Sequence, residues 1–273
     1  MGDKIHIIKN VEETVMIDNR FNGEEYTKEI RTRKYLPDGQ ELDAEKTVIM
    51  EHQMDLFVNE ELAGRLVCVP EYLSEFVIGR LITEGFITDM ADVNKLYICE
   101  EASRARVFLN REIELIDSDR PEPTCCTGNR IYLKPSVTKT DKLPAHTWKA
   151  DDVFRLCEHF AQDTELHRKT SGTHSCYLMY KGEIVFSASD IGRHNALDKA
   201  VGYAVINQLD RNACMLYTTG RVPIDMVEKA IMARIPVLVS KAVPTDKAID
   251  LAKEYGITLI FSAWPDSFEI CAE

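Results

Sequence analysis

Two adjacent cysteines, Cys125 and Cys126, carry the strongest chemical signal in the sequence. They lie on a segment bounded by proline and glycine, which favours an accessible loop. Arg120 and Arg130 flank this segment, and nearby positive charge favours the thiolate, which is the nucleophilic form of cysteine. The pattern predicts a nucleophile or sulfur carrier. The alternatives are ordinary loop cysteines or half of a zinc site, although zinc thiolates are generally spaced roughly two to four residues apart.

A second cluster of polar residues occupies positions 190–199, with the sequence Asp-Ile-Gly-Arg-His-Asn-Ala-Leu-Asp-Lys. A glycine leads into a helix whose first free N–H groups attract anions, and Arg193 adds a planar fork suited to phosphate. Two polar pairs are spaced four residues apart and share a side of this helix: His194 with Asp198, and Asn195 with Lys199. We interpret the segment as an anion site. The alternative is a capped amphipathic helix with a solvated polar face.

Three more polar segments flank predicted strands. His174 stands at the entrance of one strand, while the other two segments follow strands and contribute Thr219, Gly220, Arg221, Lys241 and Thr245. Ligands of open α/β sheets collect outside the carboxyl ends of the strands, so these side chains are candidates for phosphate or hydroxyl recognition. Neither a Walker loop nor a dinucleotide-binding glycine fingerprint occurs in these segments.

The pattern of elements divides the chain into two parts with a connection between them. Residues 1–120 predict a smaller α+β domain, with short strands at 47–50, 55–58, 65–69, 95–99 and 104–110 and a helix at 70–86. Residues 1–45 read as an irregular arm or edge strands. Residues 121–150 form the cysteine-bearing connection. Residues 151–273 begin with a helix whose apolar face includes Phe160 and continue with a hairpin of strands at 176–180 and 183–187. After a further helix, short apolar strands at 214–218, 237–240 and 258–261 alternate with helices at 224–233 and 246–255, which predicts an α/β layer with largely parallel strands.

Composition limits the class of partner and the compartment. The 45 acidic and 33 basic side chains give a net charge of −12, which disfavours DNA or RNA but permits a local pocket for one small anion. No apolar run approaches the roughly 18 to 20 residues of a membrane span, and residues 1–10 lack the pattern of a secretory signal. We therefore expect a cytoplasmic protein with no membrane partner. Its other six cysteines lie in apolar settings and are predicted core residues.

Residues 190–199, 219–221 and 239–245 resemble the formate dehydrogenase accessory sulfurtransferases of the FdhD/NarQ type. Residues 51–59, 79–81 and 83–87 match the same family, and the resemblance runs from about residue 46 to the end. It implies a dimeric protein with a cytidine deaminase-like, three-layer C-terminal domain. It also implies transfer of persulfide sulfur from a cysteine desulfurase to a molybdenum or tungsten bis-guanine-dinucleotide pterin cofactor, as cargo destined for formate dehydrogenase.

This chain departs from the family pattern at two places. The resemblance makes Cys125 the persulfide carrier, but Gly128 stands where relatives have a second cysteine, so Cys126 is the candidate for the second thiol. A C-terminal turn where relatives often carry arginine and glycine contains different residues here, which remain candidates for cofactor contact: Ser262, Ala263, Trp264, Pro265, Asp266 and Ser267.

Two competing functions remain open. A zinc hydrolase of the deaminase type requires His-x-Glu followed by Pro-Cys-x-x-Cys, whereas His174 is followed by Ser175 and Cys176. A non-catalytic cofactor chaperone would use the same anion-binding residues, with the cysteines only contacting a partner.

Overall fold

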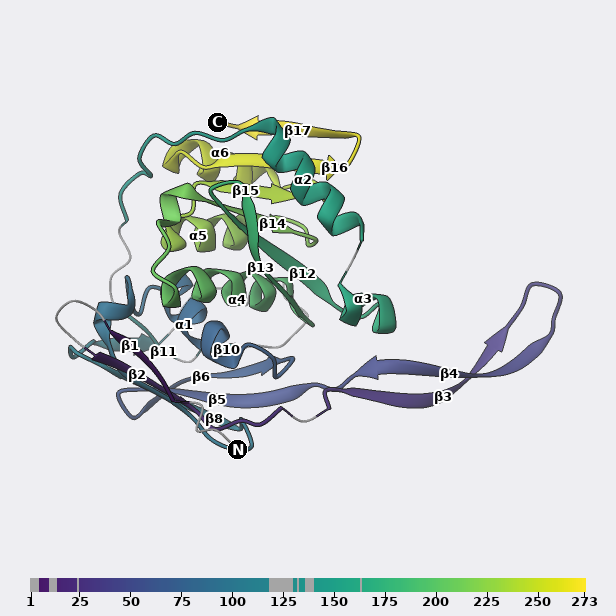
Figure 1. The fold of residues 1–273 in the computed structure, drawn as a ribbon, viewed down its shortest axis with the longest axis horizontal. Coiled ribbons are helices and arrows are strands. Elements are labelled where there is room, and N and C mark those ends of the chain that lie inside the picture. The colour runs from purple at the N-terminus through teal and green to yellow at the C-terminus, as the bar shows by residue number, and fades with distance from the viewer. Residues whose placement is uncertain are drawn as a thin grey trace.

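The computed structural model describes residues 5–9, 14–23, 25–117, 130–131, 133–135, 140–162 and 164–273. Two sheets lie above one another with helices between them, and a long two-stranded arm extends away from both (Figure 1). Helix α1 (Leu73–Thr83) contacts the N-terminal sheet, and α4 (Arg193–Ile206) contacts the C-terminal sheet. Because α1 packs on α4, these two helices join the halves of the molecule.

The N-terminal sheet has seven strands in the order β1-β2-β7-β8-β5-β6-β10. Its strands are β1 (Ile5–Lys9), β2 (Thr14–Asn19), β5 (His52–Val58), β6 (Glu61–Cys68), β7 (Val93–Ile98), β8 (Arg104–Leu109) and β10 (Arg130–Ile131). The alternating burial of β5 places Met54, Leu56 and Val58 against the core. Two short strands, β9 (Leu115–Asp117) and β11 (Leu133–Pro135), pair beside this sheet.

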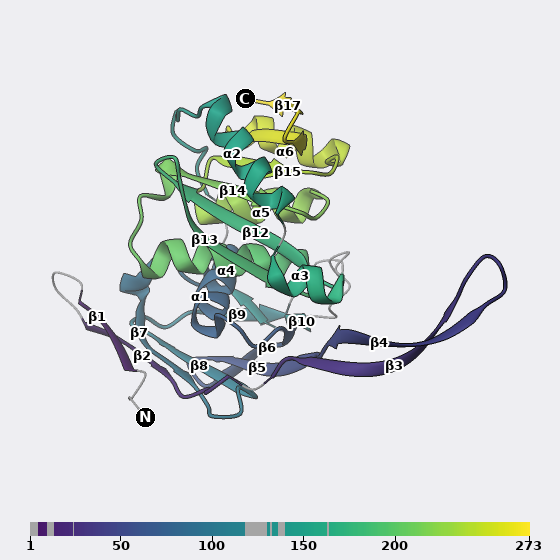
Figure 2. The same cartoon turned by 45° about the vertical axis from the view of Figure 1, so that its right-hand side comes forward.

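The arm is an antiparallel hairpin of β3 (Thr27–Tyr35) and β4 (Glu41–Ile49), joined by a turn at residues 36–40. No residue of either strand is buried, and Figure 2 shows the hairpin projecting beyond the rest of the molecule. Residues 1–45 were predicted to be an irregular arm or edge strands. They include two strands of the N-terminal sheet, β1 and β2, and most of this hairpin.

The C-terminal sheet has six strands in the order β13-β12-β14-β15-β16-β17. They are β12 (His174–Tyr180), β13 (Glu183–Asp190), β14 (Cys214–Thr218), β15 (Val237–Ser240), β16 (Thr258–Trp264) and β17 (Ser267–Ala272). Helices α4, α5 (Ile224–Ala233) and α6 (Asp246–Tyr255) pack on one face, and α2 (Ala150–Ala161) packs on the other. A short helix, α3 (Glu165–Thr170), precedes β12.

The mixed α/β class is confirmed, and so is the hairpin of strands at 176–180 and 183–187, but the prediction of largely parallel strands holds only for the centre of the C-terminal sheet. Within this sheet the β14–β15 and β15–β16 pairs are parallel, whereas β12–β13, β12–β14 and β16–β17 are antiparallel. The reason is that two hairpins, rather than helical crossovers, add strands at the two sides of the parallel centre. No helix among the described residues is both long and apolar enough to span a membrane.

Helices α1 and α4 cross with backbone touching backbone. A Cβ atom added to Gly79 would lie 1.7 Å from the carbonyl oxygen of Asp198, and one added to Gly202 would lie 1.8 Å from the carbonyl oxygen of Glu75. Since real Cβ atoms never approach so closely, glycine is required at both positions. This crossing fixes how the two halves of the molecule sit together.

Four of the six cysteines outside the 125–126 pair are buried: Cys68, Cys157, Cys176 and Cys214. Burial raises the thiol pKa of Cys157 to about 11 and that of Cys214 to about 12, so these thiols stay protonated. Cys99 and Cys271 are partly exposed, which the prediction of six core cysteines missed.

Candidate functional site

The turns that follow β14 and β15 lie side by side at the carboxyl edge of the parallel strands. Thr218 and Ser240 are partners in the β14–β15 ladder, so the residues after them leave the sheet at the same level. Val222 forms a bridge with Pro244, and the Thr245 amide donates to the Val222 carbonyl. The structure thus brings together the two predicted turns, 219–221 and 241–245.

Arg193 reaches this edge from the first turn of α4. A Cβ atom added to Gly220 would lie 2.7 Å from both Cβ and Cδ of Arg193, so the missing side chain of Gly220 makes room for the arginine stem. Ser240 Oγ donates to the Gly220 carbonyl at 2.8 Å and fixes that turn. The N-terminus of α4 therefore lies against the loop after β14.

His174 stands where several positive charges converge. It begins β12 and pairs with Asp190 at the end of β13. Burial lowers the pKa of His174, and the positive charges of Arg193 and Lys241 lower it further, with smaller contributions from His167 and His194. A neutral histidine surrounded by cationic groups is the electrostatic signature of a place that favours an anion.

The turn between β16 and β17 is connected to Lys241 through one aromatic ring. Lys241 Nζ lies 5.1 Å from the centre of the Phe160 ring, and the ring of Trp264 lies 5.7 Å from the same ring. Trp264 pairs with Ser267 around a tight turn that contains Pro265 and Asp266. The turn at 262–267 therefore lies at the same edge as the other candidates, and Phe160 belongs to this group although its sequence pattern marked it only as core.

His194 contacts α5 and not the polar residue four positions along its own helix. Its Nε2 lies 2.9 Å from Oδ2 of Asp225, and only 4% of the His194 side chain is exposed. Burial alone would raise the pKa of Asp225, but the hydrogen bond and charge of His194 outweigh it and hold the pKa below its ordinary value. Sequence reasoning missed Asp225 because its partner is 31 residues away.

Asn195 and Lys199 meet at one buried carboxylate, Asp190. Lys199 Nζ lies 2.8 Å from Oδ2 of Asp190, and Asn195 Nδ2 donates to Oδ1 at 2.8 Å. Asp190 also accepts the backbone N–H of Val69, whose carbonyl accepts from Lys199. All three side chains are fully buried and link α4 to the end of β6, so their contacts explain them as structural groups.

Asp198 belongs to a second buried network between α1, α4 and α5. It accepts from Thr83 at 2.7 Å, from Arg80 at 3.3 Å and from Lys229 at 2.9 Å. Glu84 lies 3.4 Å from Lys229, so two acids and two bases balance one another. The predicted role of Asn195, Asp198 and Lys199 in cofactor binding stays a prediction, and the structure gives each of them another task.

A chain of hydroxyl groups runs beneath the edge toward a neighbouring cavity. Thr219 Oγ1 accepts the Ser175 amide at 2.9 Å, Ser175 Oγ lies 2.9 Å from Ser189 Oγ, and Ser189 Oγ lies 2.8 Å from Thr164 Oγ1. Thr219 is 9% exposed, whereas Arg221, two residues further along the chain, is exposed. The buried hydroxyls hold β12, β13 and the β14 turn in register.

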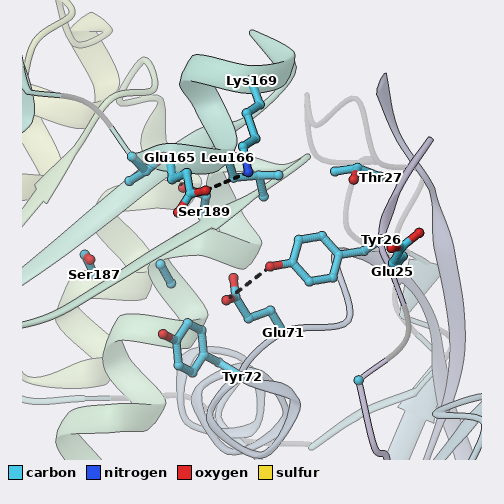
Figure 3. Close-up of a pocket in the computed structure, with 13 residues that line it drawn as sticks. Glu25, Tyr26, Thr27, Glu71, Tyr72, Glu165, Leu166, Lys169, Ser187 and Ser189 are labelled. Atoms are coloured by element: carbon cyan, nitrogen blue, oxygen red, sulfur yellow. Dashed lines mark hydrogen bonds and ion pairs between the residues drawn. The ribbon is translucent and has the colours of Figure 1, made fainter. Parts of the chain in front are cut away.

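The cavity at the foot of the arm has about 500 Å³ and a different chemistry (Figure 3). Glu25, Glu71 and Glu165 line it, and its one lysine, Lys169, is paired with Glu165 at 2.6 Å. Tyr26 Oη donates to Glu71 at 3.5 Å. An acidic lining of this kind does not suit a phosphate, so the cationic edge is the better candidate for an anionic ligand.

The predicted thiols Cys125 and Cys126 lie outside the described residues. Cys99 is the thiol of the described part whose pKa is held down. Burial raises its pKa, but hydrogen bonds from Ser103 and from the Arg104 amide, the latter at 3.3 Å, lower it below the ordinary value. Sequence reasoning missed this because the donors become neighbours only through the turn that follows β7.

Comparison with known proteins places the chain among its relatives. A sequence model described as the FdhD/NarQ family matches residues 49–273. The "Sulfur carrier protein FdhD" of Listeria monocytogenes is 31% identical over 80% of this chain and 86% of its own length, and that of Geobacillus kaustophilus is 34% identical over 81% and 86%. The "Protein FdhD" of Methanocaldococcus jannaschii is 31% identical over 84% of this chain and 89% of its own.

A solved structure shares the fold. The crystal structure of a putative formate dehydrogenase accessory protein from Desulfotalea psychrophila aligns with a TM-score of 0.75 at 22% identity. The alignment covers 91% of this chain and 98% of the other, so nearly the whole architecture is common to both. With a family match over most of its length and relatives above 30% identity, this chain belongs to the FdhD/NarQ family.

Proposed function

We propose that this chain is a sulfur carrier that acts in the maturation of formate dehydrogenase. The observation that carries the proposal is its membership of a family whose similar relatives bear the name sulfur carrier protein. Cys125 is the carrier thiol, and Cys126 is the second thiol of the same loop. The protein acts in the cytoplasm, as a homodimer, between a cysteine desulfurase and the dehydrogenase.

Loading of sulfur is a thiol–persulfide exchange. The Cys125 thiolate attacks the terminal sulfur of a persulfide on the desulfurase, and a new S–S bond forms as the donor's S–S bond breaks. The donor cysteine leaves as a thiolate, so no external oxidant or reductant is consumed. The product is a persulfide on Cys125.

Delivery passes the sulfur on to the acceptor and uses the second thiol. The Cys126 thiolate attacks the inner sulfur of the Cys125 persulfide, and the terminal sulfur leaves as sulfide for the metal of the acceptor cofactor. The step forms a disulfide between Cys125 and Cys126, which a small dithiol reductant must reopen before the next cycle.

The acceptor, a molybdenum or tungsten bis-guanine-dinucleotide pterin, is cargo bound at the carboxyl edge of β14, β15 and β16. Support comes from the positive groups gathered there, Arg193, Arg221 and Lys241, with the uncharged His174 beside them. These groups suit phosphates, and the N-terminus of α4 adds backbone N–H donors. The same edge is bordered by Thr219, Gly220, Thr245 and the turn at 262–267. We also propose that the C-terminal domain has a cytidine deaminase-like fold.

Persulfide loading tests the carrier role. Incubation with a cysteine desulfurase and free cysteine is expected to add about 32 Da, the mass of one sulfur, to the peptide containing Cys125. Cys99→Ala is the matched control, because it removes the thiol whose pKa is lowered in the described part of the chain. A Cys125→Ala protein that no longer loads sulfur but still activates formate dehydrogenase would show a cofactor chaperone instead.

Nucleotide binding tests the cargo site. Arg193→Ala is expected to weaken GDP binding at least tenfold, whereas Lys181→Ala, an exposed lysine at the far end of β12, is expected to leave it unchanged. A bound phosphate also adds negative charge near His174, so its pKa should rise on GDP binding, which NMR titration measures. Equal GDP affinity in both variants would remove Arg193 from the site.

A further inference from the structure

The β3–β4 arm has two chemically different faces. Residues opposite one another in an antiparallel pair point to the same side, and successive residues alternate sides. The register therefore puts Lys28, Ile30, Thr32, Lys34, Leu42, Ala44, Lys46 and Val48 on one side, here called the lysine face. The opposite side carries Glu29, Arg31, Arg33, Tyr35, Glu41, Asp43 and Glu45 together with Thr27, Thr47 and Ile49.

The lysine face is basic and apolar and contains no acidic residue. Its three lysines are exposed, and they surround a stripe of Ile30, Leu42, Ala44 and Val48, in which Leu42 is 47% exposed. The opposite face pairs its charges internally, as in the Arg33–Glu41 contact at 3.3 Å. In a chain with a net charge of −12, a surface with three positive and no negative side chains is selective for an acidic partner.

The arm has little of its own to hold it in place. Its sheet contains two strands only, so both outer edges lack a strand partner within the described part of the chain. Each strand has nine residues, a reach of about 30 Å. β4 contacts α3, and Thr27 at the start of β3 lines the cavity beside α3. Isolated two-stranded hairpins are marginally stable, so an element of this kind gains most when another surface covers it.

β10, the strand that follows the cysteine-bearing segment in the chain, lies at the edge of the N-terminal sheet beside β6. β10 and β5 are both antiparallel to β6 and so run in the same direction. Arg130, the first residue of β10, is opposite Arg65, which is opposite Asp55 in the middle of β5. β10 therefore begins about 10 Å along the sheet from the start of β5, where the arm joins it.

We propose that the lysine face of the arm is a docking surface for an acidic protein partner, one that presents carboxylates around an apolar strip. The partner is the protein that exchanges sulfur with this chain; this identity, but not the docking itself, rests on the proposed function. Held by the arm, the partner is brought near β10, the strand that follows the cysteine-bearing segment in the chain. The match to the FdhD/NarQ family covers residues 49–273, so the residues of the lysine face lie before the matched part of the chain.

Two double variants of the full chain with equal change in net charge test the proposal. Lys28→Glu/Lys34→Glu reverses the lysine face, and Arg31→Glu/Arg33→Glu reverses two charges on the opposite face. Binding to purified cysteine desulfurase and to purified apo-formate dehydrogenase of the same organism is measured by calorimetry at low salt. For one of these proteins, the lysine variant should raise Kd at least tenfold and the arginine variant less than about threefold. The difference should shrink at high salt.

The outcomes separate the alternatives. Equal effects of the two variants, or no effect on either partner, would overturn the proposal. So would a change in the sedimentation of the lysine variant alone, because the lysine face would then contact a second copy of the chain. Thermal unfolding of both variants should match the wild type. Loading of Cys125 from a low-molecular-weight persulfide should be unchanged in both, and a wild type that loads no sulfur would refute the carrier role while leaving the binding result valid.

Discussion

The crossing of α1 and α4 at Gly79 makes a quantitative prediction about stability. In Gly79→Ala the new Cβ would lie 1.7 Å from the Asp198 carbonyl oxygen, so the helices must separate by roughly 1.5 Å to reach van der Waals contact. Overpacking of this kind costs about 1–3 kcal/mol, and more where backbone must move. Alanine in place of glycine favours a helix by only about 1 kcal/mol, so the net effect is a loss.

With the upper end of that cost less the helix gain, the expected decrease in the free energy of unfolding is about 2 kcal/mol, measured by urea denaturation. A loss of this size corresponds to a fall in Tm of roughly 4–8 °C for a chain of this length. Gly202→Ala should behave alike, because its Cβ would lie 1.8 Å from the Glu75 carbonyl oxygen. The double variant should cost less than the sum of the singles, since one separation of the helices accommodates both methyl groups.

Gly172→Ala is the matched control for this experiment. Its added Cβ meets no atom closer than 3.7 Å, so its unfolding free energy should stay within about 1 kcal/mol of the wild type. If Gly79→Ala unfolds as the control does, or if the two single effects simply add, the backbone contact between α1 and α4 is refuted.

Three further predictions concern the buried charges and the thiols. Asp198→Asn leaves its buried cationic partners short of one negative charge and should lower the unfolding free energy by about 3 kcal/mol or more, measured by denaturation. Iodoacetamide should label Cys99 at lower pH than an ordinary thiol and leave Cys68 unlabelled in the native protein. The reason is that the pKa of Cys99 is lowered, whereas burial raises that of Cys68. Mass spectrometry of the labelled peptides measures this, and equal labelling of the two cysteines would contradict it. The folded pKa of Asp225 lies below its unfolded value, so its contact with His194 stabilises the fold above pH ~4 and is lost as pH falls through the folded pKa. Asp225→Asn should flatten that part of the stability curve, and an unchanged acid limb would refute the assignment.

Much of the C-terminal half could be predicted from its apolar periodicity. The helices at 224–233 and 246–255 and the strands at 214–218 and 237–240 are confirmed at their predicted bounds. Helix α3 was not predicted because none of its residues is buried, which leaves no apolar stripe to detect. β17 was missed because its exposed and partly buried residues do not alternate in hydrophobicity over its length.

The candidate site was only partly predictable, for a physical reason. The edge of the sheet follows from strand order, so the turns at 219–221 and 241–245 could be placed together before the structure was known. The fate of Lys199 could not, because residue type does not reveal burial. Its partners lie in different halves of the chain, Val69 directly after β6 and Asp190 at the end of β13, and a polar residue on a helix is normally solvated. Phe160 was read as core because its helix gives the same apolar pattern in either role.

The shared ion pairs also bear on how the chain reaches its native state. Asp190 and Lys199 form hydrogen bonds with the backbone of Val69. Asp198 forms an ion pair with Arg80. Atoms from the first half of the chain therefore satisfy charges that are buried in the second half. Without the first half, these groups would lose the partners that make their burial possible, and the face of α4 that packs on α1 would be exposed. Folding of the two halves is therefore cooperative. A fragment that starts at residue 150 should remain a molten or aggregated species, and adding the N-terminal half in trans should restore a single sharp unfolding transition.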